Sequence, residues 1–161
     1  MTATAIPADL HPVEPGYRNA LRARAAFFWG PVFIASLVAN AVALSDSQFS
    51  GVLPAVIGLI GLSGIIVAPD RIYRRLGYAI DGRLLRTVRG WLFHTDTIVP
   101  FVRVQHIDVT RGPFDKLFGT ATLVVHTAGT HNSIVTLPGL SPERAAEVRD
   151  AIPTEIRANA E

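Results

Sequence analysis

Two almost uncharged apolar runs, joined by a short polar loop, constrain what this chain can fold into. The first run, 25–44, has no ionisable side chain, and at about 1.5 Å per residue a helix of that length crosses a hydrocarbon core of roughly 30 Å. The second run, 52–68, also lacks ionisable groups and is close to the short limit for a span. Pro69 and Asp70 are expected to end it. The sequence therefore predicts a helical hairpin in a membrane.

The charges around the runs predict the orientation of the hairpin. Basic residues precede the first run and follow the second: Arg18, Arg22, Arg24, Arg71, Arg74 and Arg75. The connecting loop, 45–51, holds neither Lys nor Arg. By the positive-inside rule, the N-terminus and everything after the second run are expected to be cytoplasmic, which predicts a two-span protein of a plasma membrane.

A secretory signal peptide is an alternative interpretation of the first run. Arginines precede it, and Ala41-Val42-Ala43 matches an A-x-A cleavage site. However, the run exceeds the roughly 7 to 15 apolar residues usual in a signal peptide, and a second apolar run follows at once. We therefore favour the hairpin.

Small and polar residues indicate how the two spans pack. On the first span a small stripe with two polar neighbours is formed by Ala35, Ala39, Ala43, Ser36 and Asn40. On the second, the small residues are Gly58, Gly61 and Gly64. Small side chains let backbones approach in a bilayer, and an amide is better placed against a helix than against lipid. We therefore expect the two stripes to face each other.

The first 24 residues predict an arm followed by an interfacial segment. Residues 1–16 contain several prolines and few large apolar side chains, which is typical of an extended, poorly ordered arm. From Tyr17 onward, aromatic and apolar residues alternate with arginines. This pattern predicts a helix that begins at the membrane interface and continues into the first span.

After the second run the pattern changes to alternating residues and frequent turns, which predicts a mainly-β domain over 69–153. Asp81-Gly82 indicates a tight hairpin between strands at 71–80 and 83–89. Further strands are expected at 95–99, 101–110, 121–127 and 133–137, with a bulge near Gln105-His106. The predicted fold is a membrane helical hairpin followed by a bent antiparallel barrel or sandwich of about six or seven strands.

Two helical segments accompany these strands. The connection 111–119 is long enough for one helical turn. At the C-terminus, Ser141 is a suitable N-cap and Pro142 suits the first helical position, so we expect a helix that caps the barrel. Pro153 is expected to end this helix, which leaves 154–161 as a tail.

A series of short motifs carries a family resemblance. In chain order they are Arg89-Gly90-Trp91, Ile98-Val99-Pro100, Gly112-Pro113, Leu117-Phe118-Gly119-Thr120-Ala121, Thr127-Ala128-Gly129 and Leu137-Pro138-Gly139-Leu140. Over 71–152 their order and spacing resemble the bacterial pleckstrin-homology (PH) domain of the YdbS-like type, many members of which carry two preceding transmembrane helices. The sequence departs from the family pattern at Phe114-Asp115-Lys116. The resemblance implies a PH-like fold and no common catalytic chemistry.

A direct search for chemistry predicts no enzyme, no cofactor and no metal site. The chain has no cysteine, which excludes thiol catalysis and Cys-ligated zinc. His94, His106, His126 and His131 lack a ligand spacing, and no phosphate-cradling glycine motif of a known type is present. The net charge of +2 is small, and we expect no nucleic-acid partner.

Two functions remain. The first is a membrane-anchored interaction module, an accessory subunit or adaptor that docks onto another membrane protein or onto itself. The alternative is binding of an anionic lipid headgroup or small anionic ligand at the cytoplasmic membrane face. The candidate contact or lipid-facing residues are Arg22, Arg24, Arg71, Arg74, Arg75, Arg86, Arg89, Trp91, Leu92 and Phe93.

Trp91, Leu92 and Phe93 are three large apolar residues at a place where a turn between strands should be polar. One interpretation folds them under the barrel as part of its core. The other makes them an exposed apolar tip that contacts protein or membrane. Arg86 and Arg89, just before the tip, would suit an anionic surface.

Overall fold

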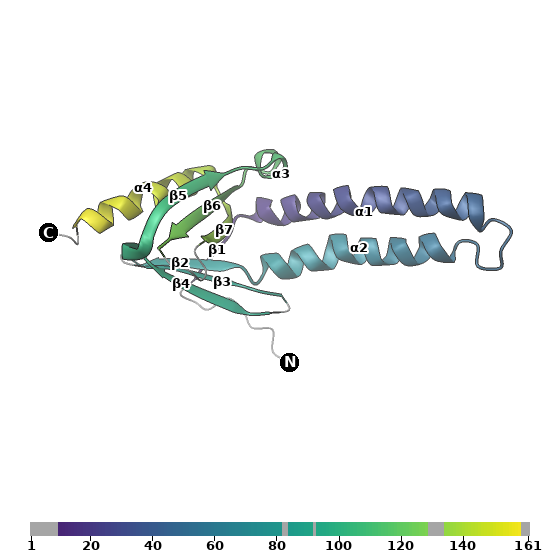
Figure 1. Cartoon of the computed structure of the whole chain (residues 1–161), viewed down its shortest axis with the longest axis horizontal. Helices are drawn as coiled ribbons and strands as arrows, with labels where there is room; N and C mark the ends of the chain where they lie inside the picture. The colour runs from purple at the N-terminus through teal and green to yellow at the C-terminus, as the bar shows by residue number, and fades with distance from the viewer. Residues whose placement is uncertain (1–9, 82–83, 92, 129–133, 159–161) are drawn as a thin grey trace.

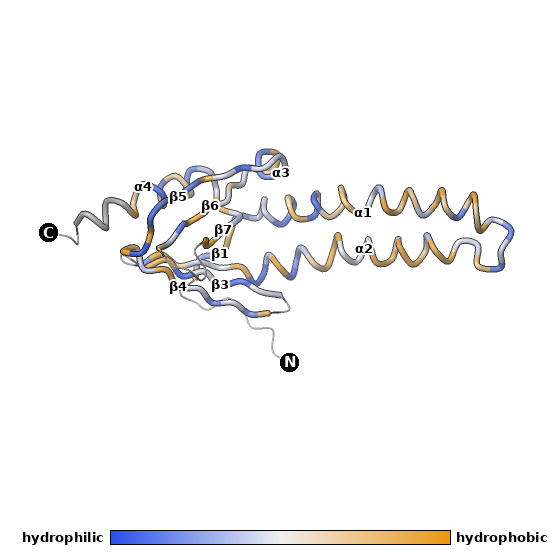
Figure 2. Tube along the Cα trace, in the orientation of Figure 1, coloured by the Kyte–Doolittle hydropathy of each residue, from blue (hydrophilic) through white to orange (hydrophobic). Residues whose placement is uncertain are grey.

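The protein is elongated, with two long antiparallel helices that extend from one end of a β domain (Figure 1). The structure is a computed structural model and describes residues 10–81, 84–91, 93–128 and 134–158. Helix α1 spans Pro15–Ala43 and α2 spans Val52–Tyr73. Both are long and apolar enough to cross a membrane, and Figure 2 shows their mostly hydrophobic residues between a polar loop and the polar end near the β domain.

Both helices continue past a proline. Helix α2 contains Pro69 and ends only at Tyr73, so the expectation that Pro69 and Asp70 end it is wrong. Asp70 stabilises the additional turn, because its carboxylate is 2.7 Å from Arg74 Nε, four residues later. Pro31 is likewise inside α1. A proline removes one backbone hydrogen bond, and helices packed in a membrane can tolerate that loss.

The β domain contains two antiparallel sheets. In the four-stranded sheet the order is β1-β2-β3-β4, formed by His11–Pro12, Gly77–Asp81, Leu84–Arg89 and Thr95–Pro100. In the three-stranded sheet the order is β5-β6-β7, formed by Val104–Thr110, Ala121–Thr127 and Ile134–Leu140. The remaining elements are η1 Phe101–Arg103, α3 Pro113–Leu117 and α4 Pro142–Ala158. The predicted fold class is confirmed.

Several boundaries differ from those expected. The segment 71–76 completes α2 and the turn after it, so the predicted first strand begins only at Gly77. Residues 101–103 form a 3₁₀ turn, and β5 starts at Val104, with the predicted bulge between Val104 and His106. Helix α4 continues beyond Pro153 to Ala158, so the expectation that Pro153 ends it is wrong. The turn residue Gly82 lies outside the described residues.

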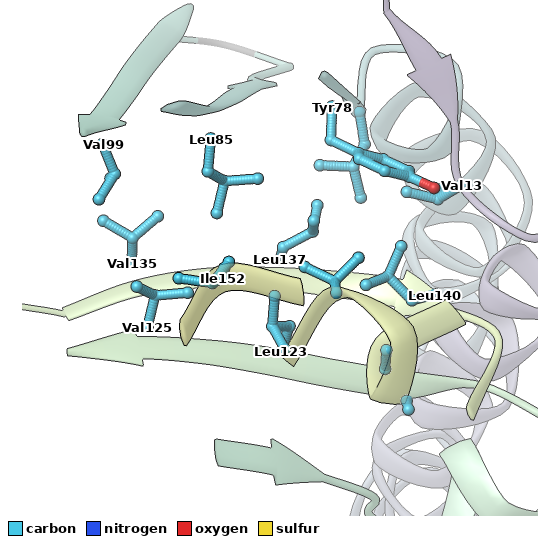
Figure 3. Close-up of a cluster of buried hydrophobic side chains, with 14 of the residues drawn as sticks. Val13, Tyr78, Leu85, Val99, Leu123, Val125, Val135, Leu137, Leu140 and Ile152 are labelled. Carbon is cyan, nitrogen blue, oxygen red and sulfur yellow. The ribbon is translucent and has the colours of Figure 1, made fainter. Parts of the chain in front are cut away.

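The core lies between the two sheets and α4. Figure 3 shows Leu85 and Val99 of the first sheet facing Val135 and Leu137 of the second, with Ile152 of α4 closing the cluster. These side chains are at most 4% exposed. The alternation of inward apolar and outward polar residues explains why these segments form strands.

The start of the chain is part of this core. Val13 and Tyr17 are buried in it, and β1 pairs with β2, His11 opposite Tyr78. The expectation of a poorly ordered arm is therefore wrong for residues 10–16, and residues 1–9 lie outside the described part. Tyr17, expected at the membrane interface, instead packs inside the domain. Burial in the core removes the apolar side chains of this segment from water, and this stabilises the folded segment.

Candidate membrane-proximal contact site

Helix α1 is attached to the β domain by a close packing contact. Tyr17 lies directly over Gly139 of β7, where a Cβ atom would be 2.7 Å from the Tyr17 Cγ atom. Gly139 also has a φ of 81°, which disfavours other residues. A backbone bond from the Glu14 amide to the Gly139 carbonyl, 2.7 Å, closes the same contact.

An ion pair adds a second attachment. Both carboxylate oxygens of Asp115, in α3, are 2.8 Å from Arg24 Nη2 of α1. Asp115 is 4% exposed and also accepts hydrogen bonds from the Gly112 amide and the Thr120 hydroxyl. Arg24, predicted as a contact or lipid-facing residue, thus binds within the protein, and its partner Asp115 was not among the predicted site residues. The acidic residue three positions after Gly112 is a helix N-terminal pattern that could have indicated its cap role, but not its partner.

The glycines of α2 face α1, but they do not face the alanine stripe. Beside Gly61 and Gly64 is the indole of Trp29, and beside Gly58 is the ring of Phe33. Ala35, Ala39 and Ala43 are exposed on the other side of α1. The expectation that this alanine stripe packs against the glycines of α2 is therefore wrong. Grooves left by glycine accept large rings, which bury more surface than alanine would.

The polar residues of the stripe do face inward. Ser36 is buried, and its hydroxyl donates to the Phe33 carbonyl at 2.6 Å. Asn40 accepts a hydrogen bond from the Gly51 amide, 2.8 Å, at the start of α2. This bond satisfies one of the free amides at a helix N-terminus and fixes the loop to α1.

The loop between β3 and β4 forms an exposed tip close to the hairpin. Trp91 is 37% exposed and Phe93 83% exposed, so the interpretation that places these two in the core is wrong. Leu92 lies outside the described residues. Arg75, just after α2, donates to the Trp91 carbonyl at 2.9 Å. Gly90 is required at the turn, because a Cβ there would collide with the Phe93 carbonyl.

Helix α3 forms a second apolar projection on the other side of the hairpin. Leu117 is 73% exposed, and the ring centroids of Phe114 and Phe27 are 6.0 Å apart. Figure 1 shows α3 beside α1, and the end of β3 with the start of β4 beside α2. The two projections therefore flank the base of the hairpin at the end where the membrane begins.

The candidate arginines divide into two groups. At the hairpin base, Arg74 pairs with Asp70, and Arg75 donates a hydrogen bond to the backbone of the exposed tip. Arg71 is exposed there. Arg22, also at the base, belongs to α1. The second group, on β3, comprises Arg86 and Arg89.

The β3 arginines bind within the domain. Arg86 Nη2 is 2.6 Å from Asp96 Oδ2 on β4, and this hydrogen bonding from Arg86 holds the pKa of the Asp96 carboxyl below its ordinary value. Arg89 donates to the Thr136 hydroxyl at 3.2 Å. Both residues therefore connect strands in addition to any role at a surface.

One cluster of titratable groups lies on the outer face of the second sheet. Asp108 Oδ1 is 2.9 Å from His106 Nε2, and Asp108 Oδ2 is 3.4 Å from His126 Nε2. Within the described ranges no group of three or more His, Cys, Asp or Glu residues is arranged to hold a metal ion. His131 lies outside these ranges. The cluster is an exposed cross-strand contact of the kind that supports a sheet.

The fold and this membrane-proximal arrangement define a membrane protein in which a helical hairpin carries a PH-like β domain. The profile of a family described as Bacterial PH domain matches residues 31–155. The UPF0699 transmembrane protein YdbS of Bacillus subtilis (strain 168) is 34% identical over 122 residues, 72% of this chain and 75% of that protein. No solved structure matches the chain significantly. The chain belongs to the bacterial PH domain family.

Proposed function

We propose that the chain is a non-catalytic, membrane-anchored interaction module, an adaptor or accessory subunit of a membrane protein assembly. The hairpin holds the protein in the membrane, and the β domain presents the contact surface beside it. Both termini and the domain are cytoplasmic in this proposal, as the arginines around the spans favour.

The observation that carries the proposal is the exposed edge of the first sheet. Strand β4 is at the edge of that sheet, and one exposed large apolar residue lies just before it, one within it and one just after it. Phe93 is 83%, Ile98 57% and Val102 82% exposed. An edge strand offers unpaired backbone groups, and an apolar edge is a preferred surface for another chain.

A site-specific cross-linking experiment tests this. A photoreactive side chain at Ile98 in the full-length protein should yield one discrete adduct in cells, whereas the same group at Glu147, exposed on α4, should yield none. Trp91→Ser should abolish the Ile98 adduct without changing the melting temperature, because Trp91 is 37% exposed. Equal adducts at both sites, or an unchanged adduct in Trp91→Ser, would contradict the proposed contact surface.

Orientation is tested separately. The chain has no cysteine, so single cysteines can be placed at Ser47 in the loop and at Glu143 in α4. An impermeant thiol reagent on intact cells should label only the Ser47 site. The reverse pattern would place the domain outside the cytoplasm.

Anionic lipid binding at the same membrane face is the second candidate function. The basic residues at the hairpin base favour it, since each juxtamembrane basic residue contributes roughly 1 kcal/mol of attraction to an anionic surface. Arg71, Arg74 and Arg75 all lie there, just before β2.

A further inference from the structure

A cavity opens between the two helices of the hairpin, within the membrane-spanning region. Its volume is about 360 Å³, and its lining includes Ala26, Trp29, Gly30 and Phe33 of α1 with Gly58 and Gly61 of α2. The volume is in the range of small-molecule pockets, roughly 300 to 1,000 Å³. Every one of these lining side chains is apolar or absent, so the cavity suits a hydrocarbon occupant.

Gly30 keeps the cavity open on the α1 side. A Cβ added at Gly30 would meet no atom within 4 Å, in contrast to Gly61, where it would be 3.3 Å from the Trp29 ring. The space beside Gly30 is therefore not filled by the partner helix. In a bilayer such a space is filled by a lipid chain or by another helix, because water there would lack hydrogen-bond partners.

Two arginines lie on α1 between the residues that line this cavity and the start of the helix in the β domain. Arg22 precedes Ala26 by four residues and Arg18 precedes Arg22 by four, so the three are on one face of α1. Arg18 faces α2, with Nη1 3.5 Å from Asp70 Oδ1 and its guanidinium 5.7 Å from the centre of the Tyr73 ring. Arg22 is thus between this ion pair and the apolar cavity.

The positive charge of these two arginines is incompletely balanced within the described part of the chain. The Nε atoms of Arg18 and Arg22 are buried and have no hydrogen-bond partner among the described residues. The Asp70 carboxylate already interacts with both Arg18 and Arg74. A buried guanidinium donor without an acceptor is costly, and phosphate oxygens are acceptors that match its geometry.

We propose that this cavity is a phospholipid site, in which one acyl chain of an anionic phospholipid occupies the groove and its phosphate accepts hydrogen bonds from Arg22. Along this face of α1, the guanidinium of Arg22 comes first and the apolar groove follows. In a phospholipid, the charged headgroup is likewise followed by the acyl chain. A transmembrane helix of another protein would have to supply a carboxylate at the same depth. The proposal does not depend on the adaptor function.

Fluorescence quenching tests it in the full-length protein. The chain has two tryptophans, so Trp91→Phe leaves Trp29, which lines the groove, as the sole reporter. The protein is reconstituted in phosphatidylcholine vesicles that contain, at equal mole fraction, either phosphatidylglycerol or phosphatidylcholine with brominated acyl chains. Quenching of Trp29 should show that brominated phosphatidylglycerol associates with the site about fivefold more strongly than brominated phosphatidylcholine. A factor of about five is what one basic residue near the surface contributes.

Three variants on this background separate the site from its surroundings. Arg22→Gln should remove the fivefold preference, whereas Arg71→Gln, which changes an exposed arginine outside the groove, should retain it. Gly30→Leu fills the open space and should reduce quenching of Trp29 by either lipid. The melting temperature of each variant in detergent identifies any that fail to fold.

Other outcomes overturn the proposal. Equal quenching by the two lipids in the Trp91→Phe protein would mean that no headgroup is recognised. An equal loss of preference in Arg22→Gln and Arg71→Gln would assign the attraction to general surface charge. Absence of quenching by both lipids, together with a change of oligomeric state in Gly30→Leu, would show that a helix of a second copy or another protein occupies the groove.

Discussion

Residues 15–24 and residues 25–43 belong to one continuous helix of 29 residues but have opposite surroundings. The first part is inside the domain: Tyr17 and Ala20 are buried, and Arg24 binds a buried carboxylate. The second part exposes most of its side chains, including Val42 at 80%. One helix is thus both a core element of the domain and a membrane span, so the domain cannot be separated from its anchor without opening its own core.

The largest expected effect comes from the part inside the domain. Tyr17→Ala removes a ring packed in the core and should lower the free energy of unfolding by about 3 to 5 kcal/mol, the usual cost of truncating a buried aromatic residue. The melting temperature of the full-length protein in mild detergent measures it. Phe28→Ala, in the exposed part of the same helix, is the control and should change little. Similar losses in both variants would remove the distinction between the two parts.

Asp115→Asn tests the ion pair at the junction of the two parts. The substitution leaves Arg24 without its charge partner and weakens the hydrogen bonds from Gly112 and Thr120. We expect the free energy of unfolding to fall by about 2 kcal/mol. This is less than the cost of breaking a fully buried pair, because the Arg24 side chain is 41% exposed. Asp46→Asn, in the loop at the far end of the hairpin, should have no such effect. An unchanged stability of the Asp115→Asn variant would show that the packing of Tyr17 alone attaches the helix to the domain.

Within the membrane part, the two faces of the hairpin should respond differently. Gly61→Leu places a side chain into the Trp29 ring and should destabilise the protein by about 1 to 3 kcal/mol, as overpacking usually does. Ala39→Leu is on the exposed side and should be tolerated. Detergent melting temperatures of the two variants compare the faces directly. Destabilisation by Ala39→Leu would restore the alanine stripe as a packing face.

The smallest effect is expected on β4, away from α1. Arg86 lowers the pKa of Asp96 below its ordinary value of 3.8, so this pair stabilises the fold at pH values above that ordinary value. The stabilisation is lost as the pH falls through the lowered pKa and the carboxylate is protonated. Asp96→Asn should cost less than about 1 kcal/mol at neutral pH, as exposed pairs do. Its melting temperature should approach that of the unchanged protein in acid, and a constant difference at every pH would exclude the ion pair as the cause.

The features that local pattern predicts well are the hairpin, most strands, the bulge and the α4 N-cap. Ser141 Oγ accepts from the Arg144 amide at 3.1 Å, as its sequence position indicated. These features depend on residues near one another in the chain. Contacts between distant segments were missed, since nothing local to Tyr17 or Arg24 indicates Gly139 or Asp115. Likewise, the sequence shows a stripe of small residues on α1, but only the fit of Trp29 and Phe33 against the glycines of α2 decides which face of α1 packs.

The candidate site was predicted in composition but not in geometry. The arginines and the apolar triplet are visible in the sequence, yet three of the arginines, Arg24, Arg74 and Arg86, form ion pairs within the protein. The exposed position of Phe93 could not be predicted, because an apolar triplet in the sequence fits a core segment and an exposed tip equally well. The exposure of Ile98 on the β4 edge could not be predicted, because a local sequence pattern does not distinguish an edge strand from a central one.

The burial of Tyr17 has a consequence for biosynthesis. Val13 and Tyr17 leave the ribosome long before Gly139 and Leu140, their neighbours in the core, so the domain is completed only when its last strand has been made. Those early and late segments can meet only if the chain has returned to its starting side of the bilayer. A hairpin inserted with its two ends on opposite sides would leave both halves of the core unfilled. Folding of the domain therefore requires that both ends of the hairpin lie on the same side of the membrane.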